Sequence, residues 1–332
     1  GTLPHPHSEN HIRANFLFRS QDLKNWEYMH QFVEGDFFTR VGDDGSCPYF
    51  FPIGDQHILL FYSHMSGGQY LLGEYDKKND KFYTSSHGLF NFGPSNPCGV
   101  HAPSAIPDGK GGIVVIFNMN PGKKNAEKIS RIISNAEENS IGRSISADYL
   151  IGKNLGQIMT LPRRLSLDKN NKLVIEPAGD IESLRYDHKK IASMKLPGNK
   201  EIVLDDIDGN SMELAIELDH KNSPMIEINV LRSPNKEEFT RISFFIKRGF
   251  KYQTSVKDNV KSVNVMSSAL AELVRHESVI SIDTSYSSIS PDVLSRAPET
   301  APVSIGEEEP VSLRIFIDKS VLEVFVNGIQ CV

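Results

Sequence analysis

The residues of this chain best suited to proton chemistry lie in one short segment, residues 42–49. It contains two adjacent carboxyl groups, Asp43 and Asp44, between Gly42 and Gly45, and glycine lets the backbone turn sharply. Adjacent carboxylates raise one another's pKa, and a carboxyl group that stays protonated can assist the departure of a leaving group. Asp44 is therefore the first candidate for a catalytic acid and Asp43 the second. A solvated Asp-Asp-Gly turn is the alternative that stays open.

Short strands are expected to position this segment. Apolar and β-branched runs, separated by Gly, Asn, Asp and Pro, occur at residues 58–62, 69–75, 112–117 and 172–175. Many short strands at close spacing indicate an all-β sandwich, barrel or propeller. A second β-rich block begins near residue 184. Its segments 212–218, 226–230 and 313–318 alternate with period two, which predicts an antiparallel β-sandwich.

Two stretches break the β pattern. Residues 123–151 carry apolar side chains at helical spacing, so we interpret 123–153 as an insertion that holds a short amphipathic helix. A surface loop without a role and a functional lid are both open for it. A second short helix is predicted at residues 267–275.

Composition excludes several classes of protein. The length of 332 residues predicts roughly two domains, and the net charge of −6 gives no footprint for nucleic acid or an anionic membrane. No apolar run approaches ~18 residues, so no membrane span is expected. The three cysteines are too scattered for a disulfide framework or a zinc cluster, and we expect no metal and no cofactor. No signal peptide is visible, and the compartment stays open. The oligomeric state is open as well.

Several separated segments resemble, in order, motifs of the invertase and fructanase group, glycoside hydrolase family 32. Residues 20–26 are similar to its S-x-D-L-x-x-W motif, and residues 100–104 to its Y-A-x-Q motif. Residues 159–165 match M-x-L-P-R-x-L, and residues 316–328 resemble a signature of its C-terminal domain. The family's Glu-Cys-Pro-Asp segment, which carries its acid/base Glu, corresponds to residues 46–49, where Ser46 replaces the Glu and Tyr49 the Asp.

The resemblance implies an all-β fold, a five-bladed β-propeller followed by a C-terminal β-sandwich. Residues 1–183 would form part of the propeller, with its N-terminal part missing, and residues 184–332 the sandwich without its closing strands. The family's W-M-N-D-P-N-G nucleophile motif and its R-D-P motif are not found in the chain. We therefore expect an interior piece of a longer protein.

The resemblance also implies hydrolysis of a β-fructofuranoside-type or related glycosidic bond by two carboxylates, with retention of configuration. A carbohydrate substrate is the expected partner. Because Ser46 cannot serve as the acid, Asp44 or Asp43 would replace it. A catalytically inactive carbohydrate-binding protein of hydrolase descent is the alternative.

The candidate sugar-contacting residues are polar or aromatic side chains near the predicted pocket. An aromatic ring can stack on a sugar, while histidine and amide groups can hydrogen-bond its hydroxyls. The candidates are Ser46, Cys47, Tyr49, His64, His101 and Asn118. Core packing is the alternative for Cys47 and Tyr49, and a structural role is the alternative for His64 and His101.

Overall fold

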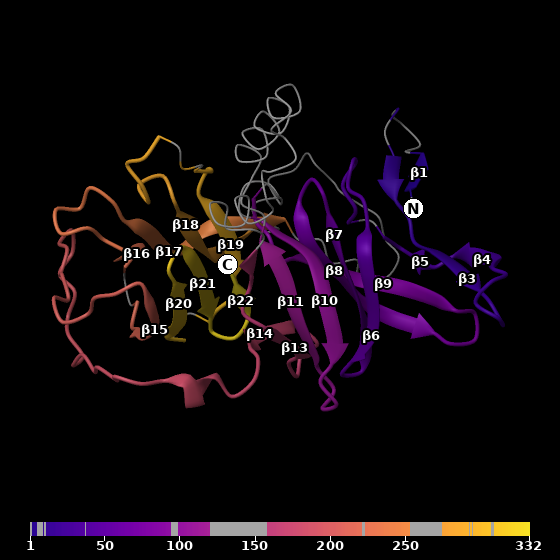
Figure 1. The fold of residues 1–332 in the computed structure, drawn as a ribbon, viewed down its shortest axis with the longest axis horizontal. Coiled ribbons are helices and arrows are strands. Elements are labelled where there is room, and N and C mark those ends of the chain that lie inside the picture. Colours follow the sequence, from indigo (N-terminus) through magenta and orange to yellow (C-terminus); the bar gives the residue numbers. More distant parts are fainter. Residues whose placement is uncertain are drawn as a thin grey trace, which may run out of the picture.

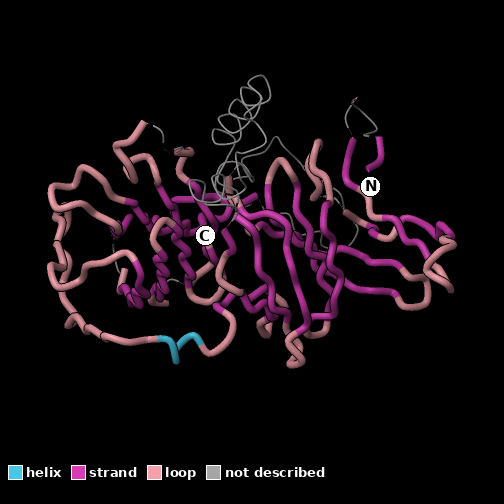
Figure 2. The backbone as a smooth tube through the Cα atoms, in the orientation of Figure 1, coloured by secondary structure: helices cyan, strands magenta, loops and turns pink. Residues whose placement is uncertain are grey.

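Antiparallel β-sheets form nearly all of the regular structure (Figures 1 and 2). The computed structural model describes residues 2–4, 9, 11–36, 38–93, 99–119, 158–220, 223–252, 274–291, 293, 295–306 and 309–332. The predicted all-β class is confirmed. Within these residues the single helical element is the turn η1 (Ile181–Leu184), and no described helix is long and apolar enough to cross a membrane.

Four sheets in the N-terminal half have a propeller-like arrangement. Two are hairpins, β1 (Thr2–Pro4) with β2 (His11–Arg13) and β3 (Phe16–Arg19) with β4 (Glu27–Gln31). The third has the order β5 (Val33–Glu34), β9 (Lys81–Leu89), β8 (Gly67–Asp76), β7 (Gln56–Ser63) and β6 (Ser46–Ile53). The fourth has the order β10 (Val100–Pro107), β11 (Ile113–Met119), β13 (Arg163–Leu167) and β14 (Leu173–Pro177), with β12 (Ile158–Met159) on β11.

The two larger N-terminal sheets share one core. Strand β11 alternates buried and half-buried residues, so Ile113, Val115 and Phe117 face inward. They pack with Leu60 and Leu72 of the neighbouring sheet. Strand β10 packs against β6, β7 and β8, so that β10 of the fourth sheet lies beside β6 of the third. This contact positions the candidate site.

Two four-stranded sheets make up the C-terminal half. One has the order β15 (Ser211–Leu218), β20 (Val311–Asp318), β21 (Val321–Val326) and β22 (Gln330–Cys331). The other has the order β16 (Met225–Val230), β17 (Thr240–Tyr252), β18 (Val274–Asp283) and β19 (Glu299–Val303). Period-two alternation on β20 buries Leu313 and Ile315, which share a core with Phe244 and Ile280 of the other sheet.

A buried ion pair joins the two halves of the chain. Arg163 on β13 donates to Glu323 on β21 at 2.8 Å, and both residues are at most 3% exposed. Glu323 also accepts the backbone N–H of Leu161 at 2.6 Å. Arg163 lies in the M-x-L-P-R-x-L segment and Glu323 in the C-terminal signature, so two of the motifs found in the sequence meet here.

Three predictions about segments have different outcomes. The insertion at 123–153 lies outside the described residues. The predicted helix at 267–275 also lies there, except for Val274 and Arg275, which belong to strand β18, so helix is wrong for these two. The proposed boundary between residues 183 and 184 falls inside η1, before an exposed connection that leads to β15 (Figure 1).

Candidate functional site

A β-bulge shapes the strand that follows the two predicted carboxylates. In the β6–β7 pair, Ser46 lies opposite Tyr62 and Tyr49 opposite Leu60, so β6 has one residue more than its partner over this stretch. Cys47, in the bulge, has a φ of 50° and precedes a proline. Bulges accommodate proline and re-aim neighbouring side chains.

The first strand of the next sheet carries a similar bulge. Along β10 and β11, His101 pairs with Asn118 and Ser104 with Ile116, which again leaves one residue extra on the first strand. Ala102 has a φ of 34° and, like Cys47, precedes a proline. Positive φ is uncommon for residues other than glycine, and such strained positions cluster at functional sites.

Tyr62 connects the two bulges. Its ring centroid lies 4.9 Å from that of His64 and 5.6 Å from that of His101. The predicted residues His64 and His101, far apart in sequence, are therefore brought to one place. Sequence reasoning missed Tyr62, because it belongs to an apolar run that predicts only a strand. The strand register opposite Ser46 is the signal that identifies it.

Asp44 is the acceptor at the centre of this cluster. It accepts the Ser46 hydroxyl at 2.5 Å and the His64 backbone N–H at 2.8 Å. The His64 ring contacts Asp44 through Nδ1 at 2.9 Å, and its Nε2 lies 2.9 Å from the Tyr62 hydroxyl. Ser46, Asp44, His64 and Tyr62 thus form one continuous polar chain.

The pKa of Asp44 is lowered, whereas the sequence predicted that it would be raised. Burial acts to raise this pKa, but hydrogen bonds from Ser46 and from the backbone and ring of His64 outweigh it, so the pKa is lowered. At neutral pH the group is therefore a carboxylate. A general acid needs a raised pKa, and hence Asp44 as it stands in this structure is suited to accept protons rather than to donate them.

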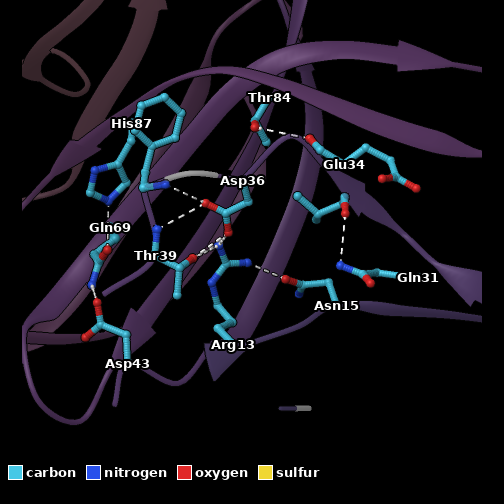
Figure 3. Close-up of polar contacts among 12 residues, drawn as sticks. Arg13, Asn15, Gln31, Glu34, Asp36, Thr39, Asp43, Gln69, Thr84 and His87 are labelled. Atoms are coloured by element: carbon cyan, nitrogen blue, oxygen red, sulfur yellow. Dashed lines mark hydrogen bonds and ion pairs between the residues drawn. The ribbon is translucent and has the colours of Figure 1, made fainter. Parts of the chain in front are cut away.

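Asp43 points into a different network, in the interior. It is 4% exposed and accepts the hydroxyl of Ser66 at 2.7 Å and the amide of Gln69 at 3.3 Å. The other end of Gln69 contacts the His87 ring at 2.8 Å (Figure 3). Although Asp43 and Asp44 are neighbours in sequence, they have separate partners. The hydrogen bonds of buried Asp43 hold the turn on its interior side.

The side chain of Arg13 packs against the same turn. It pairs with Asp36 and donates to Thr39 at 2.7 Å (Figure 3). It also stacks over the Phe61 ring, with its guanidinium carbon 4.3 Å from the ring centroid. Gly45 passes directly over this side chain, because a Cβ at Gly45 would lie 2.3 Å from Arg13 Cδ. The glycine before Ser46 is therefore required by close approach.

Replacing Gly45 tests this close contact with Arg13. We expect Gly45→Ala to lower the free energy of unfolding by roughly 1–3 kcal/mol, since the added methyl group overlaps a buried side chain. Urea denaturation measures the loss. Gly198→Ala is the control, because a Cβ there meets nothing within 4 Å. A Gly45→Ala protein as stable as this control would show that Arg13 gives way freely.

The remaining predicted residues differ in solvent exposure and packing. Cys47 is exposed, and Asn118 is half-buried beside His101. Tyr49 is half-buried and packs against the core, with its ring 5.9 Å from that of Phe51. Within the described part of the chain, no group of three or more His, Cys, Asp or Glu side chains is arranged to hold a metal ion.

Comparisons with known proteins agree with this fold. Residues 180–332 match the family model "Glycosyl hydrolases family 32 C terminal". The structure of sucrose-6-phosphate hydrolase from Lactobacillus gasseri aligns over 97% of this chain and 54% of its own, with 15% identity and a TM-score of 0.60. A fructosyltransferase from A. japonicus aligns over 98% and 59%, with 12% identity and a TM-score of 0.57. The structure titled A. japonicus CB05 aligns over 98% and 58%, with 12% identity and a TM-score of 0.56.

These matches define the class of protein. The chain spans little more than half the length of these solved structures, and at these identities the likeness shows the fold alone. No curated protein matches the chain. Together with the family model, the matches confirm the predicted resemblance: this is a glycoside hydrolase family 32-like protein.

Proposed function

We propose that this protein hydrolyses a β-fructofuranoside or a related glycosidic bond. The single observation that carries the proposal is the polar cluster of Asp44, Ser46, Tyr62, His64 and His101. Two equivalent bulges in neighbouring sheets gather it at the segment that resembles the family's acid/base motif. A carboxylate, hydroxyl groups and imidazoles in one place can bind sugar hydroxyls and move protons.

The proposed architecture is a five-bladed β-propeller followed by a β-sandwich. The N-terminal sheets within residues 1–183 would supply part of the propeller, and residues 184–332 the sandwich. The shared core of the two C-terminal sheets supports the second assignment, because face-to-face packing around inward residues is the basis of a sandwich.

The roles follow from the contacts of each residue. Asp44 is the site carboxylate, and Asp43 holds the turn that carries it. Ser46, Cys47, His64, His101 and Asn118 line the proposed sugar site, with Tyr49 at its edge. A retaining reaction needs a second carboxyl group about 5–5.5 Å from the first. We propose that this nucleophile comes from outside residues 1–332.

Turnover of furanosides tests the proposal. The full-length protein is incubated with sucrose, inulin, levan and aryl fructofuranosides, and released sugar and its anomeric configuration are measured by NMR. We expect hydrolysis with retention, a loss of at least ~10²-fold in Asp44→Asn, and a smaller loss in Ser46→Ala, which removes one of the hydrogen bonds to Asp44. Equal activity of Asp44→Asn and wild type would remove Asp44 from the mechanism.

A sugar-binding protein without catalysis is the second candidate. Ser46 at the position of the family's acid and the lowered pKa of Asp44 favour it. Saturable binding of fructosides by calorimetry, with no turnover of any of the four substrates, would establish this function instead.

A further inference from the structure

We propose that His64 is the proton-transferring group of this site, oriented by Asp44 and held by Tyr62. The inference deepens the proposed function and rests on it. Its basis is the unbroken contact from Asp44 Oδ2 to His64 Nδ1, and from His64 Nε2 to the Tyr62 hydroxyl, each 2.9 Å long.

Asp44 fixes which nitrogen of the ring carries a proton. A carboxylate only accepts hydrogen bonds, so the Nδ1 atom that contacts it must be the donor. In the neutral ring Nε2 is then an acceptor, and it faces the Tyr62 hydroxyl. When the ring gains a proton, Nε2 becomes a donor. Nε2 is therefore the atom at which a proton is taken up or released.

Asp44 itself accepts hydrogen bonds from three donors. The Ser46 hydroxyl, the His64 backbone N–H and the His64 ring all donate to it. Its negative charge stabilises the positive charge that develops on the imidazole, as the carboxylate does in a serine protease triad. Asp44 is thus a positioning residue in this proposal.

His64 lies at the solvent-exposed side of the cluster. Its side chain is 67% exposed, compared with 32% for Asp44. Asp44 before β6 and Tyr62 on β7 contact the ring, and two further titratable groups, Cys47 on β6 and His101 on β10, lie beside Tyr62. A sugar oxygen that reaches Nε2 would replace the Tyr62 hydroxyl as its partner.

The reaction balances in two steps. In the first, a carboxylate nucleophile attacks the anomeric carbon and the glycosidic C–O bond breaks, with its electron pair going to the leaving oxygen. Protonated His64 gives its Nε2 proton to that oxygen. In the second step, water attacks the anomeric carbon and neutral His64 takes its proton, which frees the carboxylate and restores the imidazolium. One water is consumed for each bond cleaved.

Leaving-group dependence tests the proposal. A sugar leaving group requires a proton, whereas 4-nitrophenolate leaves without one. We expect His64→Gln to lower kcat/KM for sucrose by ~10²–10⁴-fold and to lower it far less for 4-nitrophenyl fructofuranoside. His188→Gln, on the exposed connection, is the matched control and should leave both rates unchanged.

A second variant separates proton transfer from ring packing. Tyr62→Phe keeps the aromatic ring beside His101 and removes only the hydroxyl at Nε2. We expect a loss below ~10-fold, since proton transfer itself stays with His64. Thermal unfolding should match wild type in both variants, which separates these effects from misfolding.

The outcomes distinguish the role of His64 from the proposed function. An equal loss on both substrates in His64→Gln overturns the role of His64 and leaves the proposed function standing. Failure of the wild-type protein to turn over any furanoside overturns both. A selective loss on sucrose supports both.

Discussion

Removing the Glu323 carboxylate is expected to cost about 3–5 kcal/mol of the free energy of unfolding. Arg163 is fully buried and is held by two contacts to Glu323, at 2.8 and 3.3 Å. In Glu323→Ala the Arg163 charge and the N–H of Leu161 would be left without this acceptor in the interior. Because β13 and β21 belong to different halves of the chain, loss of the ion pair should destabilise both halves. Urea denaturation followed by fluorescence and by circular dichroism measures it.

The control is an exposed ion pair of the same kind. Glu27 and Arg19 are 2.9 Å apart with side chains 63% and 65% exposed, so Glu27→Ala should cost at most about 1 kcal/mol. The double variant Arg163→Met with Glu323→Leu should recover much of the loss, because apolar side chains remove the unpaired charge. A cost for Glu323→Ala as small as that of Glu27→Ala would contradict the role assigned to this pair.

The second large effect concerns His87 and pH. Burial lowers the pKa of His87 from 6.5 to about 4, and its ring stacks on Phe38 and contacts Gln69. In the unfolded chain the ring binds a proton near pH 6.5, whereas in the folded protein it does so only near pH 4. The contribution of His87 is therefore fully present above pH 6.5 and is lost as the pH falls to 4. It amounts to at most about 3 kcal/mol.

A difference measurement isolates this contribution. Carboxylates with lowered pKa values, such as Asp44, also lose stability in acid, so wild type and His87→Gln are compared at several pH values. The stability of the variant should fall less steeply between pH 6.5 and 4. His11→Gln, at an exposed position, should follow wild type. Parallel curves for wild type and His87→Gln would show that His87 binds a proton as readily in the fold as in the unfolded chain.

Part of the site was predictable, because strand patterns and local motifs are local properties. The segment at 42–49, together with His64 and His101, was identified from sequence, and the structure brings Asp44, Ser46 and both histidines together. Tyr62 was missed because an aromatic residue at the end of an apolar run carries no sign of its partners. Tyr49 was expected at the sugar; it lies beside the β6 bulge, half-buried and packed against the core, and its contact with a sugar stays a proposal.

The sequence by itself determined the all-β class and the resemblance to family 32. Period-two alternation and turn residues act over a few positions, so they can be read without knowledge of distant contacts. Only the tertiary structure decided the state of the two carboxylates. Asp43 and Asp44 are adjacent in the chain, but Ser66 and Gln69 hold the first, while Ser46 and His64 lower the pKa of the second. A pKa depends on burial and on hydrogen-bond donors from other strands, and strand register, which is set by the packing of whole sheets, determines which donors those are.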